Sequence, residues 1–503
     1  MFRSGNVVAR LFEREIRSPR PGASINCARQ FYENIVPNCT VYDVDCPDLS
    51  FRKFSDDGRY LITFSRNCQD LRVYRPKWFT YSYTGENDTL PPSSRKFDSF
   101  FVPLYSVPLA SSDESICKDF FLYMEDHQFG LFATSTAPNQ IVGAIPGIPL
   151  SERITFHLVR LEDGVTLDEK VFTNDFIYLA NNSGVYLYDD LLAVVSLRYQ
   201  MIHIIQVRAS GHLVDVRTIG AFCREDDELF LRSTSSNPPN VDNPQSPFLS
   251  GIKQRLLSFI FRTIWNEETD DHLRVQNLKK KFYFHFQDYV ELVILKVHFL
   301  DRHHLLIKFG SVDGGGDHQP SFFAVYQMET TEFVAFYQNS GEDLYFFYEQ
   351  FNDHFYATSR KAIHTNFISS HSNNVHAYEQ LKSIQSKSTN FSLFVRKMLL
   401  PFPFNCQSLS PSPYFDQSLF RYDDKLISAT DRHRPATDHP IKFISRRPPH
   451  SLKFKIKQGP EAGNADGRVK KLCSFLFHPF LPLVLSVQQS MLLQSSINIH
   501  FRQ

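Results

Sequence analysis

Two pairs of neighbouring aspartates are the first residues in this chain that suggest acid–base chemistry. Asp189-Asp190 and Asp423-Asp424 each follow a tyrosine and precede an apolar run. The pairs recur at one position of a repeated pattern, and that repetition favours turn chemistry, in which Asp accepts hydrogen bonds from nearby backbone N–H groups. We therefore predict that these carboxylates shape turns and do not catalyse a reaction.

Other candidate chemical groups also have structural explanations. His303-His304 lie beside an apolar strand without a third metal ligand nearby, so they indicate the start of a strand. Gly314-Gly315-Gly316 is followed by no helical pattern and is interpreted as a loop, not a phosphate cradle. The motifs G-x-x-x-x-G-K-[ST], H-E-x-x-H and G-x-S-x-G do not occur. We predict no catalytic residues, cofactor or metal, so a binding or scaffold protein is expected.

The composition of the chain argues against several classes of protein. The 54 basic residues balance 54 acidic ones, so no global field attracts nucleic acid or an anionic membrane. The eight cysteines include no C-x-x-C pair, which argues against a zinc ribbon and suits a reducing compartment. The first residues lack the apolar core of a secretory signal, and no apolar run reaches the ~18 residues of a membrane helix. No membrane association is expected.

A strand–turn–strand pattern organises most of the chain. In Phe51–Tyr74, two strands are predicted, with a turn at Asp56-Asp57-Gly58 and alternating Tyr60, Ile62 and Phe64 on one face. An aromatic residue, then turn residues, then an apolar strand recurs at Tyr123, Tyr188, Phe299, Tyr422 and Phe477. Repeated units of this kind must stack or close into a ring to bury both faces. We predict an all-β fold, a WD40-like β-propeller spanning 31–503, with a pair of large β-sandwiches as the alternative.

Two segments of the predicted propeller change to helical spacing. The first lies near 248–298 and carries Lys279-Lys280-Lys281, which is either a solvated helix face or a weak nuclear-import patch. The second lies near 343–400, with helices expected at 344–355 and 376–400. The β-pattern then returns, and we expect the last strand to pair with an early one, because closure removes exposed edges.

The N-terminal segment 1–22 stands apart from the rest. Val7, Val8, Leu11, Phe12 and Ile16 have spacing that gives a helix one apolar face, and Pro19–Gly22 ends that helix and forms a linker. The helix either folds back onto the β-domain or docks into a groove on a partner. The sequence leaves both alternatives open.

Several stretches resemble the De-etiolated family of light-signalling repressors. VDVRTIGAFCREDDEL is the most specific match, and the others follow in the family's order. The matching stretches are Asn6–Arg14, Val36–Ser65, Val214–Leu229, Pro320–Glu332, Ser412–Lys425, Asp438–Phe443 and Cys473–Gln488. The resemblance is thin over 75–118, where the chain is weakly patterned, and over 357–400. The resemblance therefore does not decide whether partner surfaces located in those two regions are kept.

The resemblance implies a nuclear, non-catalytic component of a cullin-4 type RING ubiquitin ligase that directs transcription regulators to proteasomal degradation. Implied partners are the damaged-DNA-binding propeller adaptor of that ligase, the adaptor's small companion, the constitutively photomorphogenic RING/WD-repeat protein and a ubiquitin-conjugating enzyme. It also implies that the N-terminal helix binds the adaptor, through Val7, Leu11 and Arg14. The alternatives are a chromatin module that binds histones and an enzyme built on a propeller frame.

Overall fold

The computed structural model describes ten stretches of the chain. These are 23–77, 96–136 apart from 125, 152–220, 251–310, 322–338, 342–350, 412–423 apart from 417, 440–457, 472–489 and 496–502. The predicted N-terminal helix, with Val7, Leu11 and Arg14, lies outside these residues. So does the helix expected at 376–400.

Most of the described elements are strands, and they form six antiparallel sheets. The first sheet contains β2 (Leu49–Phe54), β3 (Leu61–Ser65), β4 (Asp70–Pro76) and β5 (Phe101–Pro108). The second contains β6 (Glu114–Ile116), β7 (Leu122–Met124), β8 (Phe129–Thr136), β9 (Glu152–Arg160) and β10 (Thr166–Asp175). The third contains β11 (Val185–Tyr188), β12 (Leu191–Ser196), β13 (Met201–Val207) and β14 (Leu213–Ile219).

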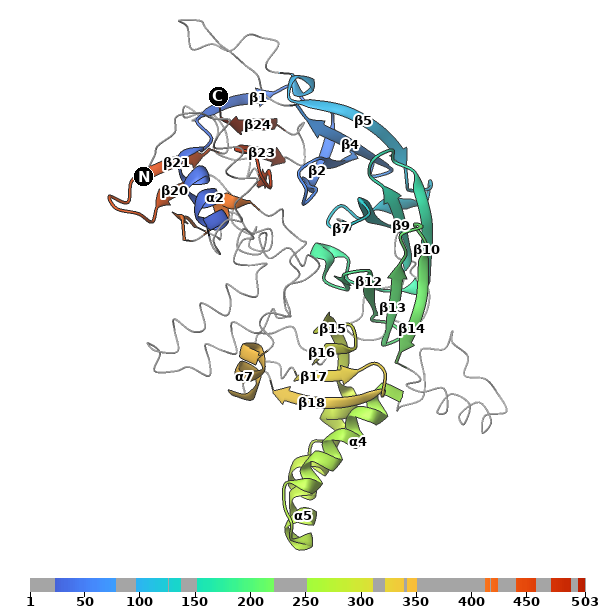
Figure 1. Ribbon diagram of the computed structural model, residues 1–503. Coiled ribbons are helices and arrows are strands. Elements are labelled where there is room, and N and C mark those ends of the chain that lie inside the picture. Colours follow the sequence, from blue (N-terminus) through green and yellow to red (C-terminus); the bar gives the residue numbers. More distant parts are fainter. Residues whose placement is uncertain are drawn as a thin grey trace, which may run out of the picture.

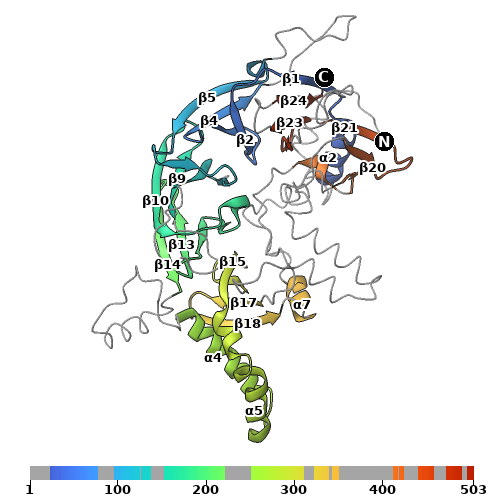
Figure 2. The same cartoon turned by 180° about the vertical axis from the view of Figure 1, so that it is seen from behind.

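The remaining sheets follow the same pattern. The fourth contains β15 (Val293–Phe299), β16 (His304–Gly310), β17 (Phe322–Gln327) and β18 (Glu332–Gln338). The fifth contains β19 (Phe420–Arg421), β20 (Ile441–Ser445) and β21 (Leu452–Ile456). The sixth contains β22 (Leu472–Phe477), β23 (Leu483–Gln489), β24 (Ser496–Phe501) and β1 (Cys39–Val44). Sheets one to four follow one another along an arc that continues from the sixth sheet (Figures 1 and 2).

An early strand and a late strand of the chain meet in the sixth sheet. β24 pairs with β23 on one side and with β1 on the other, in the register Cys39 with Phe501. A late strand therefore pairs with an early one, as expected. The sequence predicts no strand after Gln488, however, and the pairing strand is β24. Ile497, Ile499 and Phe501 alternate along β24 and are buried, a pattern that the sequence-based prediction missed. The polar residues between them, Asn498 and His500, bond Ser486 and Thr40.

The first sheet corrects the prediction for Phe51–Tyr74. The stretch contains three strands, and every residue of β3 is buried. Ile62 and Phe64 pack toward the second sheet, where Phe64 meets Phe132 edge-on at 6.2 Å between ring centroids. Leu61 packs into the cluster shared with the sixth sheet. Both faces of β3 are therefore buried, not one alone, and its polar Thr63 is accommodated by a hydrogen bond from its hydroxyl to the Arg72 carbonyl at 2.8 Å.

Two further elements are absent from the prediction. β5 lies in the weakly patterned region 75–118 and is half-exposed along most of its length, so it has no alternating pattern. Helix α2 (Ala23–Asn34) precedes the first strand, where the sequence indicates only the start of the β-pattern. It is held by contacts distant in sequence: Arg29 pairs with Asp416 at 2.9 Å, and the Tyr32 hydroxyl donates to the Phe480 carbonyl at 3.0 Å.

The first predicted helical insertion forms an arm that projects beyond the fourth sheet (Figure 1). It contains α4 (Gly251–Asn266), α5 (Asp271–Asn277), the π-helix η4 (Leu278–Tyr283) and α6 (Phe286–Glu291). The apolar spacing read from the sequence is that of α4, whose Leu256, Ile260 and Ile264 are buried. The helical prediction near 248–298 is wrong at its C-terminal end: the helices end at Glu291, and residues 293–298 belong to strand β15, which pairs with β16. In the second segment, α7 covers Glu342–Gln350.

The turn after Tyr188 tests the role predicted for paired aspartates. Asp190 accepts a hydrogen bond from Gln206 at 2.6 Å and pairs with Arg302 of the next sheet at 3.1 Å. These donors hold the pKa of Asp190 below its usual value, against the opposing effect of burial. The carboxylate therefore ties its turn to β13 of the same sheet and links the third and fourth sheets. Asp424, its predicted counterpart, lies outside the described residues.

Replacing Asp190 with alanine should lower the free energy of unfolding by about 0.5–2 kcal/mol, because one hydrogen bond and one partly exposed ion pair are lost. Chemical denaturation of the variant would measure this. Combining it with Arg302→Ala separates the two contributions, since the double variant should lose less than the sum of the single ones. Additive losses would show that the ion pair does not link the sheets.

Candidate functional site

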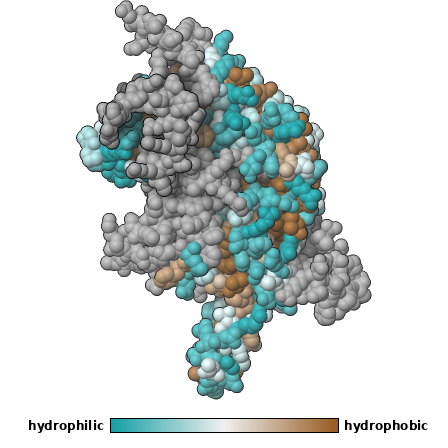
Figure 3. Space-filling view, viewed as in Figure 1, coloured by the Kyte–Doolittle hydropathy of each residue, from teal (hydrophilic) through white to brown (hydrophobic). Residues whose placement is uncertain are grey.

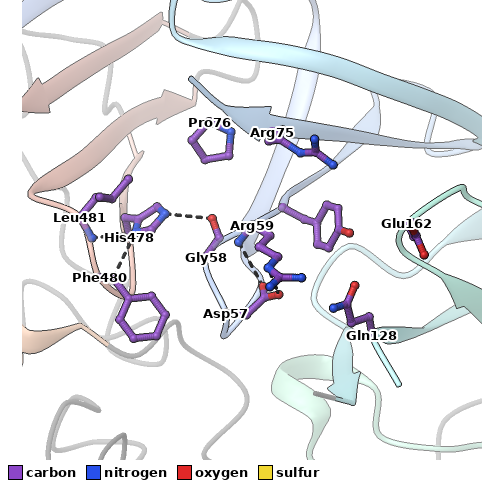
Figure 4. A pocket seen from close by; sticks show the side chains of 11 residues that line it. Asp57, Gly58, Arg59, Arg75, Pro76, Gln128, Glu162, His478, Phe480 and Leu481 are labelled. Carbon is purple, nitrogen blue, oxygen red and sulfur yellow. Dashed lines mark hydrogen bonds and ion pairs between the residues drawn. The ribbon is translucent and has the colours of Figure 1, made fainter. Parts of the chain in front are cut away.

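A cavity of about 530 Å³ lies where turns from three sheets converge. Figure 4 shows its lining side chains coming from the β2–β3 turn, the end of β4, two turns of the second sheet and the β22–β23 turn. The lining residues are Asp57, Gly58, Arg59, Tyr60, Arg75, Pro76, Gln128, Glu162, His478, Phe480 and Leu481. The site thus joins residues separated by more than 400 positions in the sequence.

The β2–β3 turn folds through local hydrogen bonds. Asp57 accepts from the Ser55 hydroxyl at 2.5 Å and from the Arg59 backbone N–H at 3.1 Å. The Gly58 N–H donates to the Ser55 carbonyl at 2.9 Å, and Gly58 has a φ of +70°. This is the Asp-Gly turn that the sequence predicts, and the left-handed conformation explains the glycine.

His478 fastens the sixth sheet to this turn. Its Nδ1 lies 3.0 Å from the Phe480 backbone N–H and 2.9 Å from that of Leu481, so Nδ1 accepts both hydrogen bonds. Its Nε2 lies 2.9 Å from the Gly58 carbonyl and must donate. Burial lowers the pKa of His478 to about 4, which keeps the ring neutral. We call the contact between His478 and Gly58 the sheet latch.

The sheet latch leaves no room for a side chain at position 58. A Cβ there would lie 2.5 Å from the His478 ring. Gly58→Ala should therefore lower the free energy of unfolding by about 2–4 kcal/mol, because the steric clash adds to the cost of a left-handed alanine. Thermal and chemical unfolding would measure the change. In a His478→Ala background the clash disappears, so the further cost of Gly58→Ala should be markedly smaller. An equal cost in both backgrounds would contradict the latch.

The rest of the cavity is suited to binding. Arg59 and Arg75 supply guanidinium groups, whereas Asp57 and Glu162 supply carboxylates, and Arg59 lies 3.6 Å from Asp57. Burial raises the pKa of Tyr60 above its ordinary value, so its phenol is available as a hydrogen-bond donor. His478 cannot serve as a general base because its hydrogen bonds engage both ring nitrogens. The arrangement provides hydrogen bonds and charges of both signs to a polar ligand or a peptide.

The sequence predicts two of the turns that line this cavity, but it does not predict that they lie together. Asp56-Asp57-Gly58 and Phe477-His478-Pro479 are both recognised as turns of the repeated unit, but nothing in their spacing shows that they meet. The predicted strand start at His303-His304 is confirmed, because β16 begins at His304. His304 lies 2.9 Å from Asp301 in its own turn, and His303 lies 2.9 Å from Glu329. Within the described ranges, no cluster of three or more His, Cys, Asp or Glu residues could hold a metal ion.

The described helices include none that is long and apolar enough to span a membrane.

Comparisons with known proteins identify the family. A family model for De-etiolated protein 1 Det1 matches residues 118–503. The light-mediated development protein DET1 of Solanum lycopersicum is 66% identical over 524 residues, and that of Arabidopsis thaliana is 62% identical over 544 residues. Both alignments cover 100% of this chain and 100% of the relative.

Similarity to solved structures is faint. An exo-β-1,3-galactanase from Phanerochaete chrysosporium aligns with a TM-score of 0.24 and 8% identity, covering 61% of this chain and 54% of that one. A score this low supports no conclusion about fold or function. The sequence relatives are decisive, and the chain belongs to the De-etiolated protein 1 family.

Proposed function

We propose that this protein acts in light-mediated development as a non-catalytic scaffold of a cullin-4 type RING ubiquitin ligase in the nucleus. The observation that carries the proposal is identity of 66% and 62% along the full length of two light-mediated development proteins. In this role the protein brings the ligase adaptor, the adaptor's small companion, the RING/WD-repeat partner and a conjugating enzyme to transcription regulators. This protein holds the partners and the substrate next to one another, and the other subunits carry out the transfer of ubiquitin.

We further propose that the six sheets are blades of a β-propeller. Apolar clusters join the first sheet to the second, the second to the third and the third to the fourth. Other clusters join the fifth to the sixth and the sixth to the first. Face-to-face packing in chain order, with β1 completing the last sheet, is the arrangement by which propellers bury both faces of every blade. Such a frame presents turns and insertions to several partners at once.

The N-terminal helix is the proposed contact with the adaptor. Val7 and Leu11 lie on its apolar face, and Arg14 lies one turn farther on. An isolated helix below about 12–15 residues is marginal in water, so this segment must bury its apolar face to remain folded. A groove on the adaptor satisfies that requirement, and the Pro19–Gly22 linker gives the helix reach.

The test is recovery of the cullin-4 adaptor with the purified full-length chain. A single charge placed on the apolar face of the predicted N-terminal helix gives the test its sharpest form, because every strand pairing of the described sheets is made between residues outside 1–22. Recovery of the adaptor by the parent protein and loss by the variant is the result that supports the proposal. Equal recovery by both would assign the adaptor contact to another surface.

A further inference from the structure

A second cavity, of about 650 Å³, lies where the helical arm leaves the fourth sheet. We call it the arm groove. Its floor is apolar and includes Phe259 and Ile264 of α4, Tyr289 of α6 and Phe336 of β18, while Lys280 and Lys281 lie on its rim. In Figure 3, hydrophobic surface gathers where the arm meets the body, whereas the projecting end of the arm is mainly hydrophilic.

The side chains that form the floor of the arm groove are fixed by contacts with residues packed beneath them. Phe336 stacks on Phe322 at 5.1 Å between ring centroids, and Tyr289 meets Phe322 edge-on at 6.3 Å. Ile264 is buried in the cluster that joins the arm to the sheets. Three elements thus fix the shape of the groove before any ligand arrives. Preformed grooves bind more tightly because less ordering entropy is lost on binding.

The rim carries positive charge that the rest of the arm does not fully neutralise. Lys281 pairs with Glu267 across the groove, from η4 to α4. Lys280 is exposed, and no carboxylate in the described part of the chain pairs with it. Both lysines lie in the six-residue π-helix Leu278–Tyr283. Helices of this type are rare and frequently mark functional sites.

We propose that the arm groove binds a segment of a partner protein that has a bulky apolar side chain next to one or two carboxylates. The apolar side chain occupies the floor between α4 and β18, and the carboxylates pair with Lys280 and, by displacing Glu267, with Lys281. The inference rests on the proposed scaffold function, as a second contact separate from the N-terminal helix. Charge complementarity selects an acidic segment over a basic one.

A random peptide library displayed on phage and selected on the full-length protein would test this. Peptides enriched in aromatic or leucine residues next to Asp or Glu are expected. Two variants should weaken their binding by at least about tenfold: Thr263→Arg, which fills the groove, and Lys280→Glu, which reverses the rim charge. The matched controls are Thr269→Arg and Lys279→Glu, which change exposed residues of the same types outside the lining and should alter binding by less than about twofold.

Several results would overturn the proposal. They are selection of basic peptides, absence of any enriched peptide, and equal binding by Thr263→Arg and the parent. A dimeric parent that Thr263→Arg converts to a monomer would show that a second copy of this chain fills the groove. Thr263→Arg should keep its melting temperature, since Thr263 is exposed. Recovery of the cullin-4 adaptor should not change in these variants, so failure here is distinguishable from failure of the proposed function.

Discussion

Acidification is expected to lower the free energy of unfolding by several kcal/mol, because buried histidines stay neutral in the folded protein. Burial lowers the pKa of His478 and of His500 to about 4 and that of His298 to about 3. In the unfolded chain these rings protonate near pH 6.5. Their contribution to stability is therefore complete above pH 6.5 and is lost as the pH falls toward 4. For His478 alone the loss is about 3 kcal/mol.

Chemical denaturation at several pH values between about 5 and 6 would measure the effect through its slope. In this range each such histidine contributes about 1.4 kcal/mol per pH unit. The matched variant is His478→Gln, whose amide can donate to the Gly58 carbonyl but does not titrate. This variant should be less stable at pH 7. Its free energy of unfolding should change with pH less steeply than that of the parent, by about 1.4 kcal/mol per pH unit. Identical slopes for parent and variant would contradict the burial of a neutral His478.

Local turn chemistry explains why much of the fold was predictable. The recurring aromatic and turn residues correctly placed the hairpins β11–β12 and β22–β23 and the turn before β16, because a turn is specified by residues adjacent in sequence. Helix α4 was predictable for a similar reason, since its apolar spacing has the helical period. Each of these elements is specified by a pattern within its own residues.

The remaining elements depend on partners that are distant in sequence. α2 is positioned by Asp416 and the Phe480 carbonyl, and one edge of β24 is paired by β1, where Thr40 bonds His500. The sheet latch also joins residues that are distant in sequence. Gly58 and His478 each have an evident local role, yet their contact arises only when the first and sixth sheets come together. A single sequence contains no signal for such a contact.

The most direct test of the scaffold account is recovery of the cullin-4 adaptor by three proteins: the full-length chain, its Leu11→Asp variant and a chain lacking residues 1–22. Leu11→Asp places a charge on the apolar face of the predicted helix, and burying an unpaired charge should cost several kcal/mol of binding. Arg14→Ala should cost less, on the order of 1–3 kcal/mol, the contribution of one charge-assisted hydrogen bond. Val7→Asp provides a second change on the same face.

The account predicts that the full-length chain recovers the adaptor, that Leu11→Asp and the truncated chain do not, and that all three unfold at the same temperature. Equal recovery by all three would contradict it, because the adaptor would then be held by another surface. A large fall in the melting temperature of Leu11→Asp would also contradict it, by showing that the helix packs against its own β-domain.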